Sequence, residues 1–146
     1  MNKMYYETSV RYRKTNDQGV SKVVTEQYLI DALSFTEAES RIIEQMKIYI
    51  GEEFRVVNIK LTNYSEVSAF EDADSWFKAK ISLLVYDENS GKEKKTNIYF
   101  LVQAVDAKNA YDNTILTLKG TVSDFSIPSI SETKIVEVFE YKEDNV

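Results

Sequence analysis

The sequence contains no cysteine and no histidine among its 146 residues. Without cysteine, disulfides, thiolate catalysis and cysteine metal sites are excluded. Without histidine, the chain lacks the commonest general base and the commonest ligand for zinc, copper and iron. There are only four glycines and one proline, and no glycine-rich phosphate loop. We therefore expect neither a conventional enzyme nor a bound cofactor or metal.

The charge and hydropathy of the sequence argue against nucleic-acid-binding, membrane-spanning and secreted proteins. The formal net charge of −6 opposes nucleic-acid binding, which needs clustered Lys and Arg to replace counterions. No apolar run is long enough to span a membrane. The first residues, 1–6, lack the apolar stretch of a signal peptide, so a cytosolic location without membrane partners is expected. The 43% hydrophobic fraction favours a packed globule over disorder.

The first half of the chain predicts a strand–strand–helix–strand unit. Residues 6–12 alternate between apolar and polar side chains, which is the period of a half-buried strand. The turn 16–19 contains Asn, Asp and Gly, and a second strand over about 20–33 completes a hairpin. A third strand is predicted over about 53–67.

A helix is predicted between the second and third strands. Ser34 can cap its first turn, and Glu37 completes a capping box. Gly51 can adopt the left-handed conformation that ends a helix. The buried stripe predicted from helical spacing consists of Phe35, Ala38, Ile42, Met46 and Tyr49.

The same order of elements returns in the second half. Residues 28–33, Tyr-Leu-Ile-Asp-Ala-Leu, match residues 100–105, Phe-Leu-Val-Gln-Ala-Val, and Asp106 replaces Ser34 as the helix cap. Gly120 ends the second helix as Gly51 ends the first. Because turn, cap, helix and last strand recur in one register, an internal repeat is the simplest interpretation.

We therefore predict an α+β fold in a single domain, 1–146. It has two tandem β-β-α-β repeats, 4–67 and 76–139, joined by a connection, 68–75, and followed by a frayed tail, 140–146. The strands are expected to be antiparallel, with both helices on one side and a pseudo-twofold relation between the repeats. One continuous sheet and two packed sheets are both open. Pro128 predicts an edge or a bulge in the last strand, because proline lacks an N–H.

With the repeat in view, residues 28–46 and 100–104, and Ser-Glu-Thr-Lys at 131–134, resemble a domain family of unknown function. The most recognisable segment is 31–39, Asp-Ala-Leu-Ser-Phe-Thr-Glu-Ala-Glu. The family occurs in gut Bacteroidetes bacteria and in their phages and conjugative elements, and it has no established catalytic residues. The resemblance implies a small protein of mobile DNA, where DNA maintenance, virion assembly and interference with host defence are typical roles.

The candidate ligand surface lies on the first strand of each repeat, on the side opposite the apolar positions. Aromatic and cationic side chains on one face can stack on a ring and pair with phosphate or carboxylate groups. The alternative is an ordinary water-facing side of a one-sided sheet. The candidate ligand-binding residues are Tyr5, Arg11, Arg13, Trp76, Lys78 and Lys80.

Two further features suggest partners. The chain has 10 tyrosines, too many for the interior alone, and tyrosine is enriched at interfaces. A homo-oligomer or a protein partner is therefore expected. The acidic cluster Glu71, Asp72 and Asp74 lacks the spacing of a calcium loop and is read as a solvated connection.

These observations predict a non-enzymatic binding protein of a phage or mobile element. Its ligand would be a small anionic, nucleotide-like molecule such as a host immune signal, held between the repeats or in a homo-oligomer. The main alternative is an acidic protein–protein module that docks on a replication, packaging or virion protein. A metal-dependent hydrolase using only Asp and Glu is a third possibility, and would require three or more converging carboxylates.

Overall fold

A computed structural model of the protein describes residues 3–121 and 124–141. Within them the fold is α+β, with eight strands in two four-stranded sheets and two helices. The chain divides into two compact units, one containing residues 1–62 and 134–146 and the other residues 63–133. This composition, repeated from unit to unit, is consistent with the tandem repeats predicted from the sequence.

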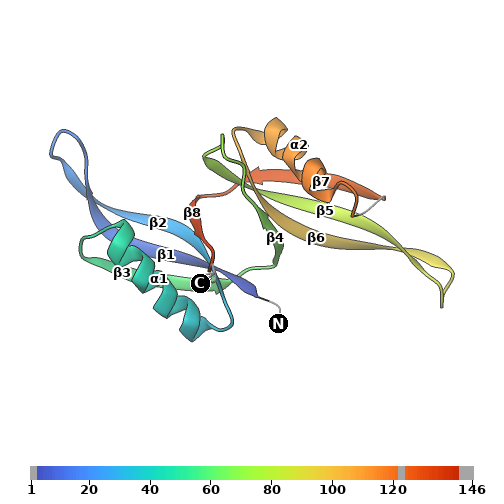
Figure 1. Ribbon diagram of the computed structural model, residues 1–146, viewed down its shortest axis with the longest axis horizontal. Coiled ribbons are helices and arrows are strands. Elements are labelled where there is room, and N and C mark those ends of the chain that lie inside the picture. The colour runs from blue at the N-terminus through green and yellow to red at the C-terminus, as the bar shows by residue number, and fades with distance from the viewer. Residues whose placement is uncertain (1–2, 122–123, 142–146) are drawn as a thin grey trace, which may run out of the picture. The chain divides into compact units, whose positions relative to one another are not determined.

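The first unit holds one helix and one sheet (Figure 1). The sheet order is β3-β1-β2-β8, and α1 packs on β1, β2 and β3. The elements are β1 (Met4–Thr15), β2 (Ser21–Ala32), α1 (Phe35–Tyr49), β3 (Phe54–Leu61) and β8 (Ile135–Phe139).

The second unit is built in the same way. Its sheet order is β4-β6-β5-β7, and α2 packs on β5, β6 and β7. The elements are β4 (Tyr64–Ser68), β5 (Ser75–Asp87), β6 (Lys92–Ala104), α2 (Ala107–Leu118) and β7 (Phe125–Glu132).

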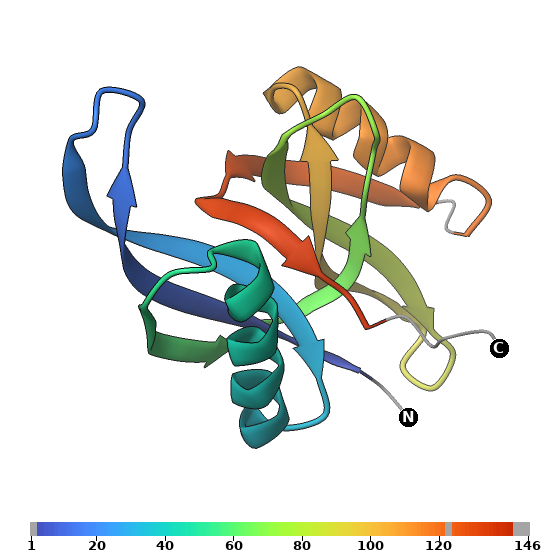
Figure 2. The ribbon, with the colours of Figure 1, turned by 60° about the vertical axis from the view of Figure 1, so that its left-hand side comes forward.

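The units exchange their outermost strands. β4 follows β3 in the chain but pairs with β6 of the second unit, and β8 follows β7 but pairs with β2 of the first (Figure 2). Both of these pairs are parallel, whereas all other pairs among the described residues are antiparallel. The predicted third strand over 53–67 is therefore wrong as one element, because the chain leaves the first sheet after Leu61. The predicted repeats 4–67 and 76–139 follow chain order. The compact units instead divide the chain after residues 62 and 133, so that β4 and β8 each lie in the sheet of the other repeat.

The helices begin and pack as their sequences predict. The Ser34 hydroxyl accepts the Glu37 N–H at 3.1 Å, and the Asp106 carboxylate accepts the Asn109 N–H at 2.8 Å. These caps satisfy first-turn donors that have no partner within the helix. Ala38, Ile42 and Met46 are fully buried against the first sheet. The ends of the predicted stripe are exposed, Phe35 by 52% and Tyr49 by 49%, although their rings pack against Tyr6 and Tyr28.

The prediction that Pro128 lies in an edge strand or a bulge is confirmed. β7 is an edge strand, and its register with β5 shifts between Lys80 and Ser82, so that Pro128 lies in a β-bulge. The first unit has a comparable bulge in edge strand β3, where the register shifts between Ser9 and Val10 opposite Val57. A bulge leaves one residue out of the ladder, which is where proline is tolerated.

The chain end is held further than predicted. The tail was expected to fray after Phe139, yet the Tyr141 backbone N–H donates to the Asp31 carboxylate at 2.9 Å. Residues 142–146 of the predicted tail lie outside the described residues. In the described part of the chain, neither helix is long and apolar enough to cross a membrane.

Candidate functional site

Two of the six predicted ligand-binding residues are buried. Tyr5 is 7% exposed and Trp76 is 4% exposed. They lie opposite Asp31 and Gln103, on the sheet faces that point away from the helices. The prediction of exposed rings there is wrong, because strand alternation assigns a side chain to a face but does not say whether that face meets water.

The two predicted lysines have aromatic neighbours within the second unit. Lys78 Nζ lies 4.7 Å from the ring centroid of Tyr99 and 5.9 Å from that of Tyr64. Lys78 and Lys80 are both half-buried. A lysine over two aromatic faces gains cation–π attraction. The Lys78 ammonium group therefore already interacts with side chains of its own sheet. The groove predicted between the two copies stays a prediction.

Arg11 and Arg13 are exposed, and the structure adds a third arginine to them. Arg11 on β1 lies directly opposite Arg55 on β3, so the two side chains emerge on the same face. Residues directly opposite in an antiparallel pair have Cβ atoms about 5 Å apart. Arg13 follows two positions along β1 and shares that face, about 7 Å from Arg11. We call Arg11, Arg13 and Arg55 the arginine cluster.

The three arginines of the cluster are exposed cations in an acidic protein. All three residues are exposed, and none of the ion pairs among the described residues includes them. Arg11 Nε donates to the Thr25 hydroxyl at 3.3 Å, which orients the guanidinium without neutralising it. Like charges directly opposite one another destabilise a sheet, so the cluster is a place where a bound anion would be stabilising.

The second unit does not repeat this cluster. The cross-strand pair next to its bulge is Ser82 and Ser126, where the first unit has Arg11 and Arg55. The candidate site is therefore a property of one unit alone. Sequence reasoning found Arg11 and Arg13 from strand alternation but missed Arg55. Only the register of β3 against β1, including the bulge, brings it to the same face.

A second ionic cluster lies at the end of β2 and is structural in character. Asp31 is buried and accepts from Arg41, from Lys3 at 3.4 Å and from the Tyr141 N–H at 2.9 Å. Burial opposes ionisation of Asp31, but the Arg41 hydrogen bond, the Tyr141 N–H and the nearby cations outweigh it and lower the Asp31 pKa. Because the Asp31 carboxylate is already bound by Arg41, Lys3 and the Tyr141 N–H, its role is to fix the end of the chain to β2.

The described residues contain no group of three or more Asp, Glu, His or Cys side chains placed to hold a metal ion. The predicted acidic cluster Glu71, Asp72 and Asp74 lies in the segment between β4 and β5, with all three residues exposed. Its reading as a solvated connection agrees with this position.

A family model described as Domain of unknown function (DUF4494) matches residues 4–141. No curated protein matches the chain.

Proposed function

The chain belongs to this family of unknown function, and we propose that it is a non-enzymatic binding protein whose arginine cluster takes a small, phosphate-bearing, nucleotide-like anion. The observation that carries the proposal is the cross-strand pair Arg11 and Arg55, two exposed guanidinium groups on one face without an acidic partner among the described residues. Guanidinium presents paired N–H donors that match phosphate oxygens.

The energetics favour occupancy of this pair. Like charges directly opposite one another destabilise the sheet. Each hydrogen bond from a charged donor contributes roughly 1.5–3 kcal/mol. A phosphate held between Arg11 and Arg55 would replace the repulsion by two or more such bonds, and Arg13 would add a third cation nearby.

The mobile-element context that the family resemblance implies suggests a ligand class. A nucleotide-derived signal of host defence carries one or more phosphates and bases, and sequestering it requires affinity but no catalysis. This agrees with a chain that has no histidine or cysteine. An acidic protein-docking module is the second candidate function, and an open groove between α1 and β3 favours it.

Thermal unfolding with a panel of nucleotides, cyclic oligonucleotides and ADP-ribose derivatives tests the proposal. A ligand at 100 times its dissociation constant adds about 2.7 kcal/mol of stability, a shift of several degrees for a chain of this size. The double variant Arg11→Ser with Arg55→Ser copies the serine pair of the second unit and should lose the shift while staying folded.

The matched control is Lys94→Ser with Lys95→Ser, which removes the same charge from exposed positions on β6. It should keep the ligand-induced shift, because these lysines belong to the second unit and are not part of the arginine cluster. An undiminished shift in Arg11→Ser with Arg55→Ser, or no shift across the panel, would refute the proposal.

A further inference from the structure

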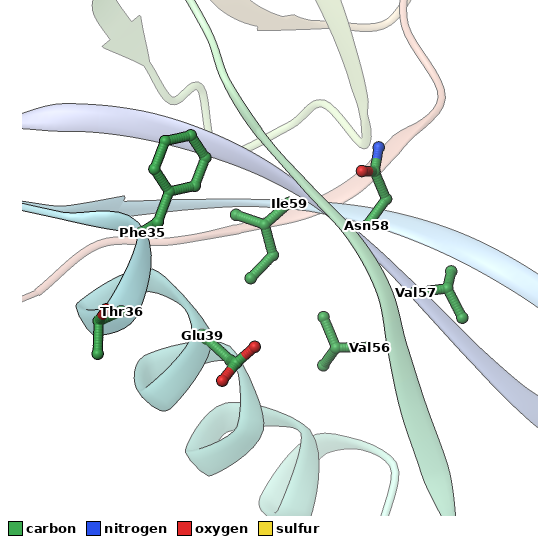
Figure 3. Close-up of a pocket in the computed structure, with 7 residues that line it drawn as sticks. All are labelled: Phe35, Thr36, Glu39, Val56, Val57, Asn58 and Ile59. Carbon is green, nitrogen blue, oxygen red and sulfur yellow. The ribbon is translucent and has the colours of Figure 1, made fainter.

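The first unit has an open groove between helix α1 and edge strand β3, with a volume of about 430 Å³. Phe35 and Glu39 line it from the helix, and Val56, Val57 and Ile59 line it from the strand. Figure 3 shows Val56 and Ile59 directed from β3 toward the helix, with the Glu39 carboxylate directed toward Val56. The groove therefore combines apolar walls with one acidic group.

One wall of the groove is an open strand edge. β3 pairs with β1 on one side, and within the described residues no strand pairs with its other side. An edge strand offers a row of backbone N–H and C=O groups to an added strand. An extended segment bound there would continue the first sheet and lay alternate side chains against α1.

The second unit shows how such an edge can be blocked. Its equivalent edge strand, β7, has Pro128 at the bulge, whereas β3 has Val57 at the corresponding bulge. Proline removes a donor and discourages strand addition. The first residue of the helix beside each edge strand also differs, since α1 begins with Phe35 and α2 with Ala107. Only the first unit thus combines an open edge with an aromatic wall.

The groove's charge selects the partner. The Glu39 side chain is exposed and takes part in none of the ion pairs among the described residues. Phe35 is 52% exposed although its ring packs edge-on against Tyr6 at 4.9 Å. The protein as a whole is acidic, with a net charge of −6, which favours encounter with a basic segment.

We propose that β3 binds an extended segment of a partner protein by strand addition, with an apolar side chain between Phe35 and Ile59 and a Lys or Arg at Glu39. The two side chains lie two positions apart in the segment, because residues two apart in a strand share a face and both must face α1. This interaction surface is separate from the arginine cluster, because Arg11 and Arg55 emerge on the opposite face of the sheet from Val56 and Ile59.

The test uses the full-length protein and a capped seven-residue peptide that has valine at positions 2 and 6, lysine at position 4 and threonine at the other positions, so that valine and lysine share one face. Calorimetry should detect binding, and hydrogen exchange should show new protection in β3. The same peptide with glutamate in place of lysine should bind at least about tenfold more weakly, since it loses the Glu39 pairing and meets an acidic protein. Equal binding of the two peptides would overturn the proposal.

Two variants locate the site. Glu39→Lys changes an exposed residue and should reverse the preference between the two peptides. Val57→Pro copies the edge of the second unit and should weaken binding of the lysine peptide by at least about tenfold. Glu88→Lys in the exposed turn between β5 and β6 makes the same charge change elsewhere and should keep the original preference.

Further outcomes separate this proposal from others. Arg11→Ser with Arg55→Ser should bind the lysine peptide normally, even if the anion proposal is wrong. Protection confined to elements other than β3 would contradict strand addition. Concentration-dependent self-association that Val57→Pro abolishes would identify the occupant as a second copy of this chain, and would overturn the proposal of a basic partner.

Discussion

The backbone N–H of Tyr141 donates to the carboxylate of Asp31 at 2.9 Å, across 110 residues of chain. In the second unit the backbone N–H of Phe70 donates to the side-chain oxygen of Gln103, also at 2.9 Å. Each acceptor lies near the end of the strand that pairs with an exchanged strand, and each donor follows that exchanged strand in the chain. The same contact therefore holds both exchanged strands in place.

The two contacts differ in charge. Arg41 donates to both the carboxylate and the backbone carbonyl of Asp31. In the second unit the side-chain amide of Asn113 donates to the backbone carbonyl of Gln103 at 3.1 Å. The contact in the first unit is thus an ion pair, whereas the contact in the second unit joins two neutral residues. The stability contributions of a charged and a neutral contact can therefore be compared within one molecule.

Asp31→Asn should lower the free energy of unfolding by about 3 kcal/mol. The asparagine keeps an acceptor for Tyr141 but leaves the half-buried Arg41 without its counterion, and breaking one partner of a buried pair typically costs this much. Chemical denaturation measures the loss. Asp112→Asn is the control, because its pair with Lys108 is an exposed helical pair worth about 0.5 kcal/mol or less.

A double variant distinguishes charge from shape. Asp31→Gln with Arg41→Asn copies the neutral residues Gln103 and Asn113 of the second unit. It should recover part of the stability lost by Asp31→Asn. Replacing a whole buried pair is often close to neutral. A double variant less stable than Asp31→Asn would show that the charges themselves are required.

The decrease in the free energy of unfolding at acid pH should depend on Asp31. Its pKa in the folded protein is lowered by Arg41, Tyr141 and Lys3 despite burial, while the unfolded value is about 3.9. The folded state therefore binds this proton more weakly, so the contribution is present above about pH 4 and is lost as pH falls through the folded pKa. Unfolding free energies measured from pH 6 downward should fall less steeply in Asp31→Asn than in the native protein. Parallel curves would contradict this assignment.

Local sequence signals predicted most elements but not their exchange. Caps at Ser34 and Asp106 and the bulge at Pro128 follow from short-range chemistry, and each is found in the structure. The departure of the chain from β3 to β4 is not encoded by alternation, because residues 53–61 and 64–68 both read as strand. A pairing choice between two similar sheets depends on contacts far apart in sequence.

The candidate site shows the same limit. Alternation correctly placed Arg11 and Arg13 on one face, but it also placed Tyr5 and Trp76 on accessible faces, and they are buried. Arg55 required the cross-strand register. Charge on a strand was thus readable from sequence, whereas exposure and cross-strand neighbours needed the tertiary structure.

The points where the chain leaves each sheet should have equal stability roles. Thr62 donates both its backbone N–H, at 2.9 Å, and its hydroxyl, at 2.8 Å, to the Tyr5 carbonyl. Thr133 makes the same two contacts to the Trp76 carbonyl, at 2.9 and 2.8 Å. Thr62→Val and Thr133→Val should each cost about 0.5–1.5 kcal/mol, the usual net value of one hydrogen bond.

Chemical denaturation of both variants checks this equivalence. Thr15→Val is the matched control, because its hydroxyl contacts Ser21 on the exposed hairpin and should change stability by less than about 0.5 kcal/mol. A cost confined to one of the two threonines would show that the two departures from the sheets are not equivalent in energy.

Two tyrosines of the first unit should resist ionisation. Tyr12 and Tyr28 both donate to the Glu26 carboxylate, Tyr28 at 3.1 Å. Burial, followed by the hydrogen bond to Glu26 and its charge, raises the pKa of both phenols above the ordinary value. In the second unit Leu83 and Phe100 occupy the comparable positions of the apolar face, so this carboxylate cluster is specific to the first unit.

The resulting alkaline behaviour has a definite sign. The folded protein holds these two protons more tightly than the unfolded chain, whose tyrosines titrate near pH 10. The contribution to stability is therefore complete below about pH 10 and is lost as pH rises toward the folded pKa values. Phenolate absorbance should show that Tyr12 and Tyr28 titrate only as the protein unfolds. Glu26→Gln should make them titrate earlier, because it removes the charge but keeps an acceptor; an unchanged titration in Glu26→Gln would assign the raised pKa values to burial alone.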